Sequence, residues 1–135
     1  MKSISTIRAK FLRLKMQARY TKLFEDLHEE DQINIAEIVK LADDEEIMLS
    51  FYPDNMYWWI LTNFRIIIND NIRLRSISYF DIKYVDLKEI FNNKEAKHNC
   101  SSVNLILQSS ENFILRIEQN TWHGIYSILR YLIYK

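Results

Sequence analysis

Three histidines and one cysteine are the side chains best suited to metal binding or catalysis, but their spacing predicts neither. His28, His98 and His123 are far apart, and Cys100 lies near His98 alone. A structural zinc site needs about four Cys or His ligands at short spacings, and a nucleophilic thiol needs an adjacent base. The acidic residues form no pair typical of general acid–base catalysis. The sequence therefore disfavours an enzyme and predicts no metal and no cofactor.

Glycine and proline are rare, which restricts what the backbone can bind. The chain contains one of each, whereas phosphate-binding loops and flexible linkers depend on glycine. The lone cysteine excludes an intramolecular disulfide and is typical of a reducing compartment. No apolar run approaches the roughly 20 residues that span a bilayer. We expect a cytoplasmic protein, with a peripheral position at the inner membrane face as the alternative.

Charge is segregated along the chain, although the formal net charge is zero. Residues 1–24 carry seven basic and no acidic residues, and residues 25–46 carry ten acidic residues and one lysine. Such blocks favour charged partners.

The basic segment has the periodicity of one long amphipathic helix over residues 4–27, with apolar residues at spacings of three and four. On an anionic membrane its apolar stripe would insert, and each basic residue would contribute about 1 kcal/mol. The candidate headgroup contacts are Lys10, Arg13, Lys15 and Arg19. In the alternative, the stripe packs on the rest of the protein or on a second subunit as a homodimer. The zero net charge and the adjacent acidic run disfavour nucleic acid as a partner.

A second helix is predicted from Asp31, its N-cap, to Ala42, and the apolar period changes to that of strands after it. Strands are predicted over residues 47–52, 57–61, 65–68, 72–77, 82–87 (with an end at 91 as the alternative), 103–107 and 113–117. An amphipathic helix is predicted over 121–134. We therefore divide the chain into a helical arm, 1–45, and a β domain, 46–135.

Two segments resemble bacterial pleckstrin-homology-like (PH-like) domains. Residues 60–67, Ile-Leu-Thr-Asn-Phe-Arg-Ile-Ile, are similar to the "LTNxRLII" stretch of those domains, and residues 75–83 resemble their "rsipyedI" segment. The resemblance covers about residues 46–135 and implies an α+β fold. It consists of a seven-stranded antiparallel bent sheet or barrel, capped by a C-terminal helix and preceded here by the helical arm.

The same resemblance implies binding rather than catalysis, because this fold hosts lipid, peptide and self-assembly functions. In lipid-binding relatives, basic residues in the first hairpin hold inositol phosphates. Here that hairpin is Tyr52–Met56 and contains no lysine or arginine, which argues against phosphoinositide binding at this position.

Two tryptophans form the first part of a predicted outer-face binding site. Trp58 and Trp59 are adjacent in a predicted strand, so they point to opposite faces. We expect one in the core and the other on the outer face, where exposed tryptophan favours binding. The alternative is cover by the N-terminal helices.

Arg65, Arg73 and Arg75 form the second part, as an anion-accepting patch across two predicted strands. The alternative is cross-strand pairing with acidic residues such as Asp81 or Asp86.

The function that we predict is non-enzymatic binding of a protein or peptide, by a sheet edge or by this aromatic and basic outer face. Membrane association through the basic helix is one alternative. The other is a small antagonist, such as an immunity or anti-toxin protein, that uses Asp43, Asp44, Glu45 and Glu46 against a basic partner.

Overall fold

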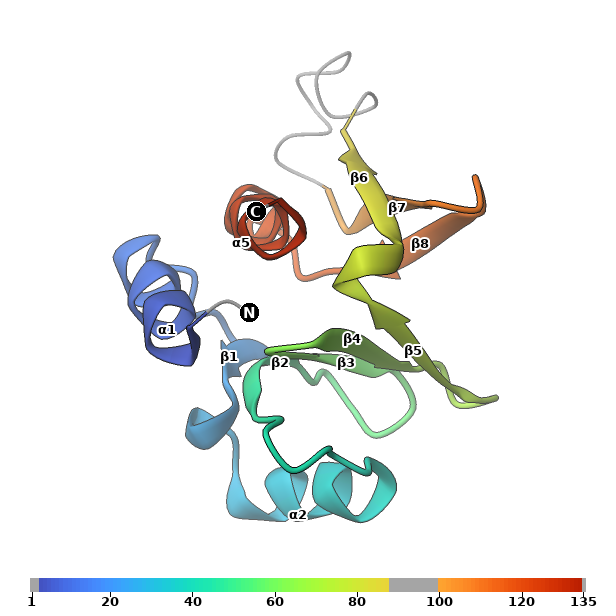
Figure 1. Cartoon of the computed structure of the whole chain (residues 1–135). Coiled ribbons are helices and arrows are strands. Elements are labelled where there is room, and N and C mark those ends of the chain that lie inside the picture. The colour runs from blue at the N-terminus through green and yellow to red at the C-terminus, as the bar shows by residue number, and fades with distance from the viewer. Residues whose placement is uncertain (1–2, 88–99, 135) are drawn as a thin grey trace. The chain divides into compact units, whose positions relative to one another are not determined.

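The computed structural model describes residues 3–87 and 100–134. The chain divides into two compact units, Met1–Ser76 and Ile77–Lys135. Figure 1 shows the elements of each unit. Residues 88–99 contain His98 and the predicted extension of a strand to residue 91, which therefore lie outside the described residues.

The first unit is built on a five-stranded sheet with the spatial order β1-β2-β3-β4-β5. Its strands are β1 (Thr21–Leu23), β2 (Ile47–Phe51), β3 (Trp58–Thr62), β4 (Arg65–Asn69) and β5 (Leu74–Ser78). Its helices are α1 (Ile4–Arg13), the short 3-10 helix η1 (Phe24–Asp26) and α2 (Glu29–Ile38). The predicted helical arm therefore contains a strand as well as two helices.

The prediction of one helix over residues 4–27 is wrong, because α1 ends after Arg13 in a Schellman motif. The Met16 N–H donates to the Phe11 carbonyl, and the Lys15 N–H donates to the Leu12 carbonyl. Lys15 takes the left-handed conformation, with φ 53°. Phe11 and Met16 are both buried and occupy the two positions at which apolar residues are typical of this motif. The usual glycine signal is absent, so the sequence does not reveal the stop.

Strand β1 follows this turn and pairs antiparallel with β2, with Thr21 opposite Phe51 and Leu23 opposite Leu49. The Tyr52 N–H extends the ladder by donating to the Tyr20 carbonyl at 2.9 Å. Counting β1, the described residues form eight strands in two sheets rather than the predicted seven. A strand of three residues is too short for its alternation to stand out within a helical pattern.

The second unit is a three-stranded antiparallel sheet with one long helix. The strands β6 (Ile82–Asp86), β7 (Ser102–Leu107) and β8 (Asn112–Arg116) follow that order in space. The 3-10 helix η2 (Tyr79–Asp81) leads into β6, and α5 (Trp122–Ile133) contacts both. One face of α5 is buried, including Ile125 and Leu129. The predicted α+β class with antiparallel sheets and a C-terminal helix is confirmed.

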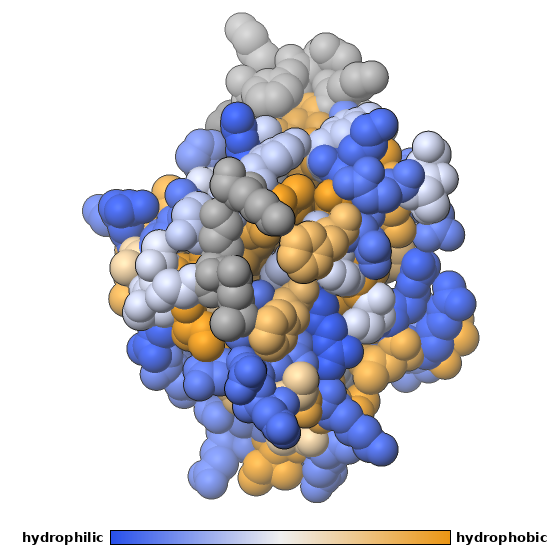
Figure 2. Space-filling model, viewed as in Figure 1, coloured by the Kyte–Doolittle hydropathy of each residue, from blue (hydrophilic) through white to orange (hydrophobic). Residues whose placement is uncertain are grey.

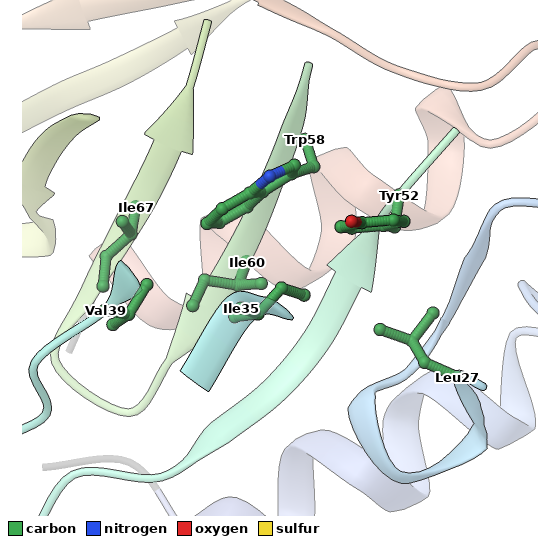
Figure 3. Packing of buried hydrophobic residues seen from close by; sticks show 7 residues of the cluster. All are labelled: Leu27, Ile35, Val39, Tyr52, Trp58, Ile60 and Ile67. Carbon is green, nitrogen blue, oxygen red and sulfur yellow. The ribbon is translucent and has the colours of Figure 1, made fainter. Parts of the chain in front are cut away.

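The core of the first unit lies between α2 and one face of the sheet (Figure 3). Ile35 and Val39 of α2 belong to the same buried cluster as Trp58, Ile60 and Ile67. Burying each such side chain contributes roughly 1.5–3 kcal/mol. The packing of α2 on the sheet thus fixes where its first turn lies.

Trp58 and Trp59 are both buried, at 1% and 0% exposure. The expectation that one of the two indoles is exposed on the outer face is therefore wrong. Trp58 joins the α2 cluster and stacks on Tyr52, with ring centroids 6.2 Å apart. Trp59 lies beside Phe51, with centroids 5.8 Å apart. The two side chains do leave the strand on opposite faces, but β3 is buried along its whole length.

Candidate binding site

Arg65 of the predicted anion patch is engaged in an internal ion pair. Its Nε donates to Glu45 Oε2 at 2.8 Å and its Nη2 donates to Glu45 Oε1 at 2.9 Å. The Glu45 side chain is 1% exposed, and the Arg65 side chain 28%. Nη2 also donates to the Lys40 carbonyl at 2.8 Å. Arg65 therefore pairs with Glu45, rather than with Asp81 or Asp86 as the alternative expected.

The other polar residues of the PH-like stretch bind the same acidic segment. Thr62 Oγ1 donates to Glu45 Oε2 at 2.6 Å, and Asn63 Nδ2 donates to the Asp44 carbonyl at 2.9 Å. The Glu46 N–H donates to Asn63 Oδ1 at 2.9 Å. The hydrogen bond from Arg65 is the largest influence on the Glu45 carboxylate and lowers its pKa to about 2. Thr62, Asn63 and Arg65 thus hold the acidic turn against the β3–β4 hairpin.

Arg65 and Arg73 of the predicted patch lie apart, whereas Arg65 Nη1 donates to Ser76 Oγ, next to Arg75 in the sequence, at 3.1 Å. Arg65 begins β4 and Arg73 follows the turn after it, so the two lie at opposite ends of that strand. At roughly 3.3 Å per residue, five residues separate those ends by more than 10 Å. Arg73 precedes β5 and is exposed, and Arg75 is partly exposed within β5. Anion binding by Arg73 and Arg75 stays a prediction.

The basic segment exposes its charges while its apolar stripe is turned inward. Ile7 and Phe11 are both 0% exposed, and α1 contacts β2. Arg13, Lys15 and Arg19 are exposed, and Lys10 is partly exposed. Insertion of this stripe into a membrane would require α1 to leave the protein. Membrane association through these basic residues stays a prediction.

A hollow of about 580 Å³ lies in the first unit where α2, β1 and the β2–β3 loop meet. Its lining comes from three segments, within residues 19–22, 27–34 and 52–55. The pairing of β1 with β2 places the first segment beside the third. The stacking of α2 on the sheet places the second beside both. Volumes of this size are typical of ligand sites, and we refer to this site as the hollow.

Tyr52 connects the hollow to the core. Its ring is 8% exposed and stacks on Trp58, as Figure 3 shows. Burial raises the pKa of the Tyr52 hydroxyl, a hydrogen bond with Asn34 opposes the shift, and nearby Asp31 and Asp54 add to it. The hydroxyl is therefore neutral at physiological pH and close to acidic side chains.

Positive side chains lie on another part of the lining. The Arg19 guanidinium stands 5.1 Å from the centroid of the Tyr20 ring, a cation–π geometry. Lys22 belongs to β1 and is partly buried. The Asp54 carboxylate accepts the N–H groups of Met56 and Tyr57, at 2.8 and 3.0 Å, and so shapes the loop. The hollow can thus contact either sign of charge at different walls.

The sequence does not reveal the hollow, because its three segments meet only in the fold, through the pairing of β1 with β2 and the packing of α2 on the sheet. Of its lining, the sequence singles out Arg19 as a candidate headgroup contact and His28 as a possible ligand or base, and it argues against phosphoinositide binding by the 52–56 hairpin. Among the residues that the structure describes, no group of three or more His, Cys, Asp or Glu could hold a metal ion. No helix in the described ranges is long and apolar enough to cross a membrane.

On the face shown in Figure 2, hydrophobic residues appear in patches separated by hydrophilic ones. Among the described residues, the most exposed large apolar side chains are Ile72 at 90% in the β4–β5 turn and Phe80 at 76% in η2.

No protein-family model and no curated protein matches the sequence. Among solved structures, the chain is similar to a DUF1696-family protein with a pleckstrin-homology domain from Shewanella loihica PV-4. The TM-score is 0.53 at 15% identity, over 78% of this chain and 92% of that one. Similarity at this identity concerns the fold alone. Together with the antiparallel sheets and the C-terminal helix, it shows that the chain has a pleckstrin-homology-like fold.

Proposed function

We propose that this protein is a non-enzymatic binding module that takes a segment of another protein into the hollow. The observation that carries the proposal is the hollow itself, a concave site of about 580 Å³ at the junction of three segments. Recognition sites of this kind combine concavity with a few fixed polar groups. The PH-like fold supports a binding role, because such folds present loops and sheet ends rather than a fixed set of catalytic residues.

The hollow is also preorganised. Tyr52 is held by Trp58 and Asn34, and Asp54 fixes the β2–β3 loop through two backbone N–H groups. A rigid site loses less conformational entropy when it is occupied, which favours binding of a short peptide. By contrast, Arg65, Trp58 and Trp59 of the predicted outer face are engaged or buried inside the protein.

Selection from a random 12-residue peptide library displayed on phage, with the full chain as bait, tests this function. Enriched peptides would be synthesised and titrated by calorimetry. Asn55→Trp places a bulky ring at the rim of the hollow, and we expect it to weaken binding by about tenfold or more, which is about 1.4 kcal/mol. Asn112→Trp, at an exposed position in β8, is the matched control and should leave affinity unchanged.

The proposal is wrong if no peptide is enriched, or if Asn55→Trp leaves the affinity of every selected peptide unchanged. Sedimentation with anionic vesicles distinguishes the membrane alternative. Vesicle binding that is lost in Arg13→Gln/Lys15→Gln, without peptide binding, would replace the hollow by the basic segment as the functional surface.

A further inference from the structure

Apart from Asp54, whose carboxylate accepts two backbone N–H groups of its own loop, the charged side chains of the hollow are separated by sign. Glu30 and Asp31 lie in the first turn of α2, whereas Arg19 and Lys22 flank Tyr20 at the start of β1. In the part of the chain that the structure describes, none of these four side chains forms an ion pair with another residue. The acidic wall and the basic wall, each named here by its pair of residues, therefore face the same hollow without neutralising each other.

Local structure accounts for each wall only in part. Acidic residues in the first turn stabilise a helix through its dipole, and Arg19 gains a cation–π contact with Tyr20. Neither effect requires the two pairs to line one concave site. Other basic residues of the same segment, Arg13 and Lys15, are exposed and lie outside it.

We infer that the occupant of the hollow is a peptide segment with one basic and one acidic side chain, an inference that rests on the proposed function. The basic side chain lies against Glu30 and Asp31, and the acidic side chain lies against Arg19 and Lys22. A segment with only basic residues would meet repulsion at the basic wall, and a wholly acidic one would meet repulsion at the acidic wall. Complementary charge at both walls sets specificity and orientation, since reversing the segment would bring like charges together.

The floor of the hollow suits the aliphatic stems of such side chains. Leu27 and the edge of the Tyr52 ring are buried apolar surface, and Pro53 is partly exposed beside them. Basic side chains commonly lay their methylene groups on such surface while the charged end stays in contact with water or with a carboxylate. Partial enclosure strengthens each charge interaction relative to bulk water.

Two small probes test the walls separately: N-acetyl-arginine amide and N-acetyl-glutamate amide, titrated into the isotopically labelled full chain and followed by NMR. We expect the arginine probe to shift backbone amides of residues 30–34, and the glutamate probe to shift those of residues 19–22. N-acetyl-alanine amide is the uncharged control and should shift neither set.

Variants then assign each response to its wall. Glu30→Gln/Asp31→Asn should weaken the arginine probe by about fivefold or more, with Glu29→Gln, an exposed residue of the same turn outside the hollow, as its control. Arg19→Gln/Lys22→Gln should do the same for the glutamate probe, with Arg13→Gln as its control. All four variants change exposed or partly exposed side chains, and the same spectra report whether each remains folded.

The inference is overturned if neither probe shifts its wall, if the probes bind the opposite walls, or if the control variants weaken binding as much as the wall variants. Each of these results leaves the selected peptides and the Asn55→Trp comparison free to support the proposed function. Conversely, probes that bind their walls while no peptide is enriched would contradict the function and leave two separate charge sites.

Discussion

Replacing Glu45 by glutamine measures how much the Glu45–Arg65 ion pair contributes to the free energy of unfolding. Among the described residues of the first unit, Glu45 is the one buried carboxylate that pairs with an arginine. Glutamine keeps the shape of the side chain and an acceptor for Thr62, but it removes the charge that Arg65 binds through two nitrogens. The pKa of Glu45 falls from 4.5 to about 2. At 1.36 kcal/mol per pKa unit, this shift corresponds to about 3 kcal/mol. Removing one partner of a buried pair costs roughly 3–5 kcal/mol in general, so the two figures agree.

The pH dependence follows from the lowered pKa. The unfolded chain takes up a proton at Glu45 near pH 4.5, whereas the folded chain resists protonation down to about pH 2. The stabilisation is therefore fully present above pH 4.5 and is lost as the pH falls through this window, with a slope of up to about 1.4 kcal/mol per pH unit. Glu45→Gln has no such titration, so the difference between the two proteins shrinks across the same window.

Urea unfolding at pH 7, 5, 4 and 3 measures this difference, followed by the fluorescence of the three tryptophans, Trp58, Trp59 and Trp122. Other carboxylates titrate alike in both proteins and cancel. Glu46→Gln, next to it and exposed, is the control and should change the free energy of unfolding by less than about 0.5 kcal/mol. A difference below about 1 kcal/mol at pH 7, or one that stays constant from pH 5 to pH 3, would refute the reasoning.

Three further substitutions test the packing and turns that position the hollow. Lys15→Gly should raise the free energy of unfolding by about 0.5–1 kcal/mol in urea titrations, because Lys15 has φ 53° and glycine takes that conformation without strain; Lys10→Gly, within α1, should lower it by about 1 kcal/mol. Ile35→Ala should cost about 2–5 kcal/mol, since Ile35 is 0% exposed in the α2 cluster, whereas Ile33→Ala at 49% exposure should cost under about 0.5 kcal/mol in the same assay. Tyr52→Phe should reduce the alkaline loss of stability: burial raises the pKa of Tyr52, so its contribution is present below pH 10 and is lost as the pH rises through the higher folded value. Melting curves at pH 8 and pH 11 check this, and a parallel loss in both proteins would contradict it.

Periodicity predicted most of the sheet and the last helix because those residues are buried in a regular pattern. The predicted strand over residues 65–68 corresponds to β4 at Arg65–Asn69, and the helix over 121–134 to α5 at Trp122–Ile133. The end of α1 could not be predicted in this way. Its stop depends on Lys15 at a positive φ and on a contact between Phe11 and Met16, and a helix with the same pattern of apolar residues satisfies the sequence equally well.

The candidate sites were harder to predict, because whether a side chain is free to bind depends on partners that are distant in the sequence. The sequence groups Arg65 with Arg73 and Arg75, its neighbours in the chain. Its actual partner, Glu45, is twenty residues earlier, in the acidic segment that the sequence offers as a surface for a basic partner. The tryptophan prediction was correct in sending the two side chains to opposite faces, but strand alternation does not show that both faces are covered.

The PH-like stretch of residues 60–67 is best explained by its role in stabilising the β3–β4 hairpin and the acidic turn beside it. Thr62, Asn63 and Arg65 direct their polar groups to residues 40–46. The apolar residues on either side of them, Ile60, Leu61, Ile66 and Ile67, are buried. Side chains engaged in this way are unavailable to a partner unless the hairpin opens, at a cost of several kcal/mol for the Glu45 pair alone. A resemblance carried by these residues therefore reports how the hairpin is held together. On the proposed function, we expect what distinguishes this protein from others with the same fold to lie where side chains retain unneutralised charge, and the hollow is a concave site in the described part of the first unit that offers it.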